Sequence, residues 1–229
     1  MDLTLNEDNL VGEGSNSKVY KWGNNVVKVF NNKNAFKNES DVYSLFSEEK
    51  NEYILPLLKE VKTQSRTSNT MIFPYVPYNL EEFIIGNYDK KIRNVDTCKI
   101  IVNILCGLNS IHSKGIYHRD FKAKNILMDD NCNIKIIDFD LTRINLSNDE
   151  FEKGKKDDLR LARIIIFQLI WGKKYHDVCY SIKKSWEQVK NELPNLYELF
   201  NVRNYNLEDL VLYFSDMNNI LKIWKKTMN

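Results

Sequence analysis

A polar segment enclosed by two apolar patterns constrains the fold of this 229-residue chain more than any other feature. The segment is His118–Asn125 (HRDFKAKN), and it follows a stretch with helical apolar spacing. The apolar run Ile134–Ile137, which is typical of a buried strand, then leads directly into Asp138–Asp140 (DFD). A carboxylate, a lysine and an amide therefore lie within six residues, and a second carboxylate follows a strand. Such a fold must bring a loop and a strand end to one site.

Composition bounds the architecture and the class of partner. The length suits one large domain or two small lobes that share a cleft. Hydrophobic residues at 43% and charged residues at 28% are typical of an ordinary globular protein. The net charge of +2 gives no reason to expect a nucleic acid or a membrane surface as partner. No apolar run approaches the roughly 20 residues that a membrane-spanning helix needs.

The cysteines indicate a reducing compartment. Cys98, Cys106, Cys132 and Cys179 are scattered and form no CxxC pair. The chain also shows no N-terminal apolar signal segment. We therefore expect reduced thiols and a cytoplasmic location, which would be the host cytoplasm if the protein is viral, with the nucleus as the alternative.

The pattern of strands and helices changes along the chain. Strands are predicted over 10–22 (two, around a glycine-bearing turn), 26–30, 53–59 and 70–73, with a helix over 39–46. The prolines of Pro74–Pro77 interrupt the periodicity. Helices are predicted over 80–85, 96–112 with Asp96 as N-cap, 159–171, 183–193 and 207–226, and a polar loop from 141 to about 156. This order predicts an α+β protein with two lobes.

The residue types at 118–138 suit phosphoryl transfer. Asp120 is a candidate to receive or orient an attacking hydroxyl, and Lys122 to neutralise charge on the transferred phosphate. Asn125 and Asp138 supply the oxygen ligands that Mg²⁺ prefers. An accidental polar loop would not be expected to keep this spacing between a helix and a strand.

These motifs resemble the catalytic and metal-binding loops of eukaryotic-type protein kinases, HRDxKxxN and DFG. Gly12-x-Gly14-x-x-Ser17-x-Val19 is similar to the family's glycine-rich loop, GxGxxGxV, with serine at the third glycine. The likeness extends from about residue 8 to 226. The chain is similar to the minimal Ser/Thr kinases of large DNA viruses. It implies a bilobal α+β fold in a single kinase domain over 1–229. The β-rich N-lobe with one helix would span 1–76, and the mainly helical C-lobe 77–229.

The resemblance also implies a nucleotide site. Lys28 would bind the α- and β-phosphates and pair with Glu39, and the alternative is an edge-strand lysine that faces solvent. Backbone N–H groups near Gly12, Gly14 and Ser17 would approach the phosphates. The adenine would contact apolar side chains and the backbone of the lobe connection, at Val19, Val26, Phe73 (the gatekeeper), Pro74, Val76 and Leu127.

Two departures from the family pattern stand out. Asp140 replaces the last glycine of DFG, which we expect to restrict switching of that loop. The segment after Asp138 is short and lacks an Ala-Pro-Glu sequence, although either Asp157 or Asp158 fits the aspartate that supports the catalytic loop. Thr142 and Ser147 are the loop residues that could be phosphorylated, and Arg119 could receive such a phosphate.

The resemblance implies an ATP-dependent Ser/Thr protein kinase that uses Mg²⁺, with Mn²⁺ as an alternative. Its catalytic residues would be Asp120, Lys122, Lys28, Glu39, Asn125 and Asp138, with Asn125 and Asp138 as the metal ligands. We expect a monomer that acts on Ser or Thr of protein substrates and binds neither nucleic acid nor membrane. Two other hypotheses remain open at this point, a small-molecule kinase on the same fold and a pseudokinase that serves as a scaffold or binding module.

Overall fold

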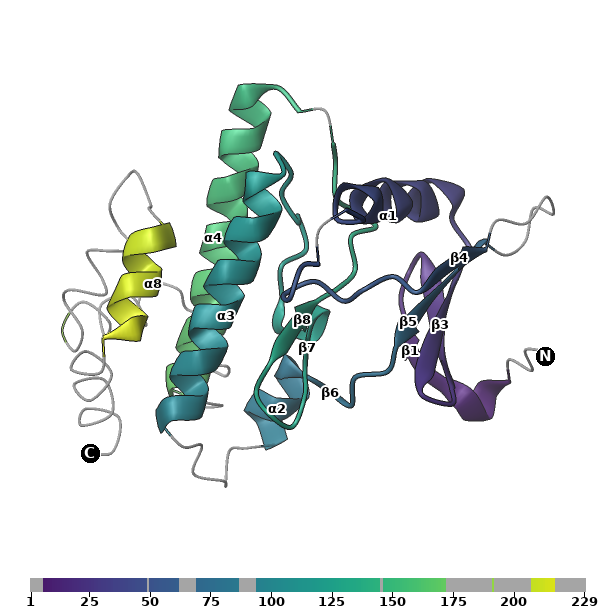
Figure 1. Cartoon of the computed structure of the whole chain (residues 1–229), viewed down its shortest axis with the longest axis horizontal. Helices are drawn as coiled ribbons and strands as arrows, with labels where there is room; N and C mark the ends of the chain where they lie inside the picture. Colours follow the sequence, from purple (N-terminus) through teal and green to yellow (C-terminus); the bar gives the residue numbers. More distant parts are fainter. Residues whose placement is uncertain are drawn as a thin grey trace.

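The computed structural model of the chain describes residues 6–48, 50–61, 69–86, 94–144, 146–171, 191 and 207–216. Of these described residues, Figure 1 shows those of the N-terminal third in a strand-rich part and the others in a helix-rich part. The predicted α+β architecture with two lobes is therefore confirmed. In the described part of the chain, no helix is both long and apolar enough to span a membrane.

The N-lobe is built on a five-stranded antiparallel sheet. Its strands are β1 (Leu10–Glu13), β2 (Ser17–Trp22), β3 (Asn25–Phe30), β4 (Lys59–Val61) and β5 (Asn69–Pro74), and a short 3-10 helix, η1 (Glu7–Asn9), precedes β1. The strand order is β1-β2-β3-β5-β4, so β3 lies in the middle of the sheet. The register pairs Lys28 of β3 with Val19 of β2 and with Met71 of β5. This central position withdraws the middle of β3 from solvent.

One helix, α1 (Lys33–Leu45), packs against this sheet. It begins six residues before the predicted start at Glu39. The side chain of Asn32 explains the early start, because it accepts hydrogen bonds from the backbone N–H groups of Asn34 and Ala35. The side chains of Phe36 and Val42 are buried on the inner face of the helix.

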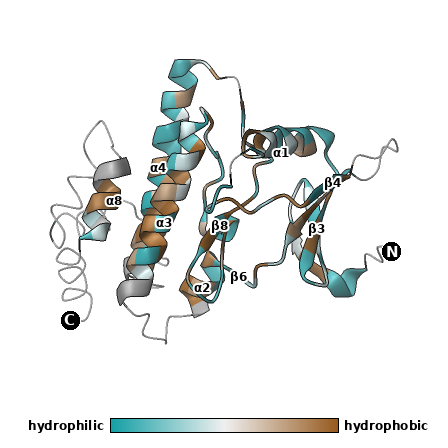
Figure 2. Cartoon of the chain, viewed as in Figure 1, coloured by the Kyte–Doolittle hydropathy of each residue, from teal (hydrophilic) through white to brown (hydrophobic). Residues whose placement is uncertain are grey.

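The C-lobe combines helices with a small antiparallel sheet. Its elements are β6 (Tyr78–Asn79), α2 (Leu80–Gly86), α3 (Asn94–Ser113), η2 (Ala123–Asn125), β7 (Ile126–Met128), β8 (Ile134–Ile136), α4 (Asn148–Trp171) and α8 (Leu207–Ser215). The sheet order is β6-β7-β8, and α3 contacts both α4 and α8. Figure 2 shows the hydrophobic parts of α3 and α4 near the centre of the lobe and the hydrophilic first turns of α4 at its outer end.

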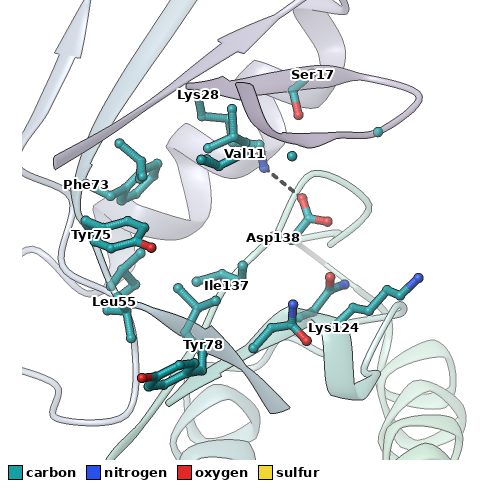
Figure 3. A pocket seen from close by; sticks show the side chains of 18 of the residues that line it. Val11, Ser17, Lys28, Leu55, Phe73, Tyr75, Tyr78, Lys124, Ile137 and Asp138 are labelled. Atoms are coloured by element: carbon teal, nitrogen blue, oxygen red, sulfur yellow. Dashed lines mark hydrogen bonds and ion pairs between the residues drawn. The ribbon is translucent and has the colours of Figure 1, made fainter. Parts of the chain in front are cut away.

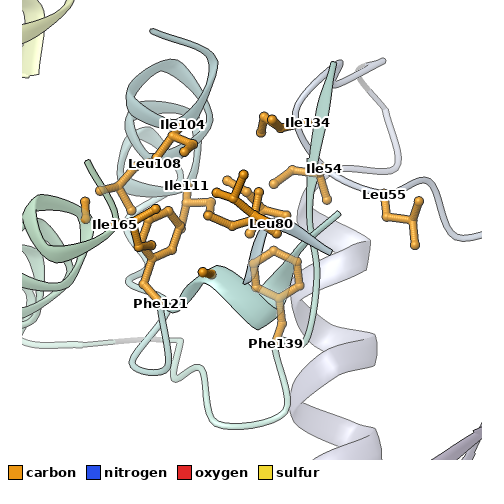
Figure 4. Packing of buried hydrophobic residues seen from close by; sticks show 14 of the residues in the cluster. Ile54, Leu55, Leu80, Ile104, Leu108, Ile111, Phe121, Ile134, Phe139 and Ile165 are labelled. Carbon is orange, nitrogen blue, oxygen red and sulfur yellow. The ribbon is translucent and has the colours of Figure 1, made fainter. Parts of the chain in front are cut away.

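A continuous apolar core joins these elements. Figure 4 shows side chains from α3, from the segment His118–Asn125 and from β8 meeting in one cluster. This segment is called the catalytic loop below, after the family motif that it resembles. Phe121 and Phe139, which lie inside the two sequence motifs, are 1% and 0% exposed. Both motifs are thus anchored by an aromatic side chain in the core, and their polar residues are held at its edge.

Three further predicted boundaries are wrong. The strand predicted over 53–59 is irregular up to residue 58, where only Ile54 forms an isolated bridge, to Ile136 of β8. Helix α3 begins at Asn94, so Asp96 lies inside it and is not the N-cap. Helix α4 begins at Asn148, so most of the loop predicted to about 156 is helical. Apart from residue 191, the helix predicted over 183–193 lies outside the described residues, as does 217–226 of the last helix.

Candidate active site

A cavity of about 570 Å³ lies between the N-lobe sheet and the C-lobe (Figure 3). Its size is within the range of small-molecule sites. All ten residues that the sequence suggested for nucleotide contact line it: Gly12, Gly14, Ser17, Val19, Val26, Lys28, Phe73, Pro74, Val76 and Leu127. Glu39, Lys122, Asn125 and Asp138 also line this cavity.

Lys28 forms two ion pairs at the back of the cavity. Its Nζ lies 2.6 Å from Glu39 Oε2 and 2.7 Å from Asp138 Oδ1. Figure 3 shows Lys28 and Asp138 pointing toward each other, one from the N-lobe sheet and the other from the segment after β8. Lys28 is 7% exposed on a central strand, which excludes the alternative of a solvent-facing edge lysine.

Burial and charge act in opposite directions on these three groups. Burial alone would lower the pKa of Lys28, but the Glu39 and Asp138 carboxylates outweigh it and raise that pKa above its usual range. Burial raises the pKa of Glu39 to about 7, and the Lys28 charge offsets only part of that effect. Burial also acts to raise the pKa of Asp138, but the Lys28 charge prevails and lowers it. Asp138 is therefore held ionised, as a metal ligand must be.

The polar side chains of the catalytic loop contact one another. Lys122 Nζ lies 2.5 Å from Asp120 Oδ2. Asn125 Nδ2 donates to the Asp120 carbonyl at 2.9 Å and to Asp120 Oδ2 at 3.1 Å. These contacts fix the Asp120 carboxylate, whose side chain is 30% exposed at the edge of the C-lobe. A hydroxyl that approaches from solvent could reach it.

The oxygen donors of Asn125 and Asp138 fit a magnesium ion. Both residues line the same cavity, and carboxylate and amide oxygens are hard ligands. Within the described residues, no group of three or more His, Cys, Asp or Glu side chains is placed to hold a metal. Mg²⁺ is commonly held by one or two protein ligands together with substrate phosphates and water, and the two residues fit that mode.

Asp158 of α4 supports the catalytic loop from below. Its carboxylate accepts hydrogen bonds from the backbone N–H of His118 at 2.7 Å and of Arg119 at 3.0 Å. Asp158 is fully buried, whereas the Asp157 side chain is 57% exposed and lies near Arg160. The choice that the sequence left open between the two aspartates is thus resolved for Asp158. The support matters because Arg119 has a positive φ of 71°.

Two hydrogen bonds hold the segment after Asp140 against the segment His118–Asn125. Arg119 Nη1 donates to the Leu141 carbonyl at 3.0 Å, and Thr142 Oγ1 donates to the His118 carbonyl at 3.2 Å. Thr142 is 1% exposed, so a protein kinase could not reach its hydroxyl in this conformation. Ser147 is exposed, and its hydroxyl donates to Glu150 Oε2 at the start of α4.

Sequence reasoning missed several residues of the cavity wall. Leu55 lines it from the irregular segment before β4, and Tyr43 from α1. The Tyr43 ring contacts both Phe73 and Phe139, with ring centroids 5.3 and 5.7 Å apart. Tyr43 lies one helical turn after Glu39, and this i, i+4 spacing is the signal that could have identified it.

Comparisons with known proteins agree with this geometry. The sequence profile of the family described as "Protein kinase domain" matches residues 5–157. A probable CTD kinase subunit alpha homolog of Encephalitozoon cuniculi is 40% identical over 84 residues, which cover 37% of this chain and 25% of the relative. The CTD kinase subunit alpha of Saccharomyces cerevisiae is 31% identical over 142 residues, 58% of this chain and 27% of the relative.

A longer match covers most of the chain. A probable serine/threonine-protein kinase of Encephalitozoon cuniculi is 31% identical over 213 residues, which cover 82% of this chain and 40% of the relative. The chain thus spans about a quarter to two fifths of the length of these curated relatives. The three relatives are fungal and microsporidian proteins, and the expected likeness to viral kinases stays a prediction.

Proposed function

This chain belongs to the protein kinase family, and we propose that it transfers the γ-phosphate of ATP to Ser or Thr hydroxyls of proteins. One observation carries the proposal. Lys28 bridges Glu39 and Asp138 at the wall of a cavity that also contains Asn125 and lies beside Asp120. This arrangement supplies a cation for phosphates, two oxygen ligands for Mg²⁺ and a carboxylate for the incoming hydroxyl.

Each residue has a distinct part in the proposed reaction. Asp120 orients the substrate hydroxyl and accepts its proton, and the ammonium of Lys122, 2.5 Å from that carboxylate, neutralises charge on the transferred group. Lys28 binds the α- and β-phosphates, and Glu39 holds the lysine in position. Asn125 and Asp138 would hold Mg²⁺, which when bound would neutralise phosphate charge. The protein contributes mainly by positioning these groups.

Two observations support Ser/Thr specificity. Lys122 lies two residues after Asp120, where Ser/Thr kinases carry a lysine. The relative that matches most of the chain is also named as a serine/threonine-protein kinase.

A small-molecule kinase is the second candidate, and the short segment after Asp138 favours it. Only residues 139–147 separate Asp138 from the start of α4, and Thr142 within them is buried. Such a segment offers little surface on which a peptide substrate could dock.

Phosphoryl transfer from labelled ATP tests both candidates. The purified chain is incubated with Mg²⁺ and either generic basic proteins or a panel of small alcohols and sugars, and phosphoamino acids are identified. Label on Ser or Thr supports the proposal, and label confined to small molecules supports the second candidate.

Asp120→Asn should lower turnover by about a hundredfold or more, since general-base groups contribute at least that much. Asp130→Asn, at an exposed carboxylate, is the matched control. Undiminished transfer by Asp120→Asn would contradict the assigned site.

A further inference from the structure

Asp140, which stands where the family has a glycine, links the two lobes. Its Oδ2 accepts a hydrogen bond of 2.9 Å from Nδ2 of Asn16, 124 residues away in the loop between β1 and β2. Its backbone carbonyl accepts a second bond of 2.9 Å from Nδ2 of Asn38 in α1. Only the first of these bonds requires a side chain at position 140, because a glycine has no carboxylate.

Asn16 is engaged from two directions. While its Nδ2 donates to Asp140, its Oδ1 accepts a bond of 3.1 Å from Nδ2 of Asn32. Asn32 in turn caps α1, the helix that carries Glu39. The Asn16 carbonyl also accepts from the backbone N–H of Asn31 at 3.0 Å. The loop is therefore attached to the start of α1 on one side and to Asp140 on the other.

We infer that Asp140 is a positioning residue that holds the β1–β2 loop and helix α1 against the segment carrying Asp138. The inference rests on the proposed function in one respect, that this loop covers the nucleotide phosphates. Asp138 lies two residues before Asp140, and Glu39 lies one residue after Asn38. The Asp140 carboxylate holds the loop and its backbone carbonyl holds α1, so one residue fixes the spacing between the loop, the lysine-binding helix and the metal ligand. The bond to a charged acceptor is of the stronger kind, and it arranges the site before nucleotide binds.

Exchanging the two partners tests the contact. In Asn16→Asp, two carboxylates face each other, although the substituted side chain can still accept from Asn32. Adding Asp140→Asn restores a donor opposite the new carboxylate, and the backbone bond from Asn38 needs neither side chain. Ser15→Asp is the matched control, because it adds the same charge to the neighbouring, exposed loop residue, and the bonds of Asn16, Asn31 and Asn32 involve none of its side-chain atoms.

Two measurements are made on each variant. The first is hydrogen exchange at the amides of Gly14 and Asn31 in the nucleotide-free protein, since both donate within the loop region. The second is the dissociation constant for MgATP. We expect Asn16→Asp to speed exchange at both amides and to weaken MgATP binding about tenfold, in line with the loss of one hydrogen bond to a charged group. The double variant should return to within about twofold of wild type on both.

The outcomes separate this inference from the proposed function. If the double variant stays as impaired as Asn16→Asp, or if Asn16→Asp exchanges like wild type, Asp140 does not position the loop. If Ser15→Asp weakens binding equally, repulsion of the phosphates explains the effect and the inference fails. If wild type binds no MgATP, the proposed function falls, while the exchange rates still decide whether Asp140 holds the loop.

Discussion

Lys28 and Asp138 lie 110 positions apart in the sequence, yet 2.7 Å separates the lysine Nζ from the carboxylate Oδ1. The same Nζ lies 2.6 Å from Glu39 Oε2, so one ammonium serves two carboxylates. The three groups come from β3, from α1 and from the segment after β8. Their contact joins the two lobes at the back of the cavity, and its strength depends on the lysine charge.

Replacing Lys28 by methionine should destabilise the protein by about 2–3 kcal/mol at pH 8, because two poorly solvated carboxylates lose their counter-ion. Urea denaturation measures the change. Lys37→Met is the matched control, since Lys37 is 72% exposed in an i,i+4 pair with Asp41 and should change stability by about 0.5 kcal/mol or less. Equal effects of the two substitutions would show that the Lys28 pairs do not support the fold.

The raised pKa of Glu39 predicts how stability depends on pH. Because the pKa of Glu39 in the folded protein is about 7, above its ordinary value near 4.3, the folded state binds the proton more tightly than the unfolded state. The stabilising contribution is therefore fully present below the ordinary pKa and is lost as pH rises through 7.

Comparison with Glu39→Gln isolates this contribution. Between pH 8 and pH 5, wild type should gain on the order of 2 kcal/mol in unfolding free energy relative to Glu39→Gln, because the amide does not titrate. Urea denaturation of the nucleotide-free proteins across this range measures the difference. Groups common to both proteins cancel in the comparison. Parallel stability profiles would mean that Glu39 titrates near its ordinary pKa.

The neighbouring residues Asp157 and Asp158 should differ in how much each contributes to stability and to turnover. Asp158→Asn replaces one of the two buried carboxylate oxygens that accept from the His118 and Arg119 N–H groups. It should lower the unfolding free energy by about 2 kcal/mol. Turnover should also fall at least tenfold, because Asp120 follows directly in the supported loop. Asp157→Asn changes the adjacent, exposed carboxylate and should leave both quantities near wild type. Denaturation and steady-state kinetics on the pair test this, and a stronger effect at Asp157 would reverse the assignment.

Local patterns in the sequence were sufficient for the class of fold. The family resemblance supplied ten residues that line the cavity, but Leu55 and Tyr43 of the same wall were missed. Strand β3 and helix α3 have clear apolar periodicity, and the spacing from Asp120 to Asn125 indicated one loop. The contact between Asn16 and Asp140 could not be predicted, because it joins polar residues 124 positions apart. Nothing in the local pattern of either residue specifies such a partner.

Helix α4 shows where periodicity misleads. Its first turns are hydrophilic and largely exposed, so they lack the apolar stripe from which a helix is predicted. The packing of α4 also depends on a residue that is distant in the sequence. A Cβ on Gly154 would overlap the Tyr117 ring, so α4 can approach the start of the catalytic loop only at a glycine. The sequence nevertheless contains a signal for the start of α4, because Ser147 and Glu150 have the spacing of a capping box.

That capping box makes the last prediction. The Ser147 backbone N–H donates to Glu150 Oε2 at 3.0 Å, and the Glu150 N–H donates to Ser147 Oγ at 3.4 Å. Ser147→Ala should therefore lower the unfolding free energy by about 1 kcal/mol, as is usual for loss of an N-cap. Glu150→Gln should cost less, because glutamine also completes a capping box. Ser113→Ala is the matched control, since the Ser113 hydroxyl donates to the Ser110 carbonyl at the end of α3 and caps no helix start. Urea denaturation of the three variants measures these differences, and a loss at Ser147 no larger than at Ser113 would mean that α4 forms without its cap.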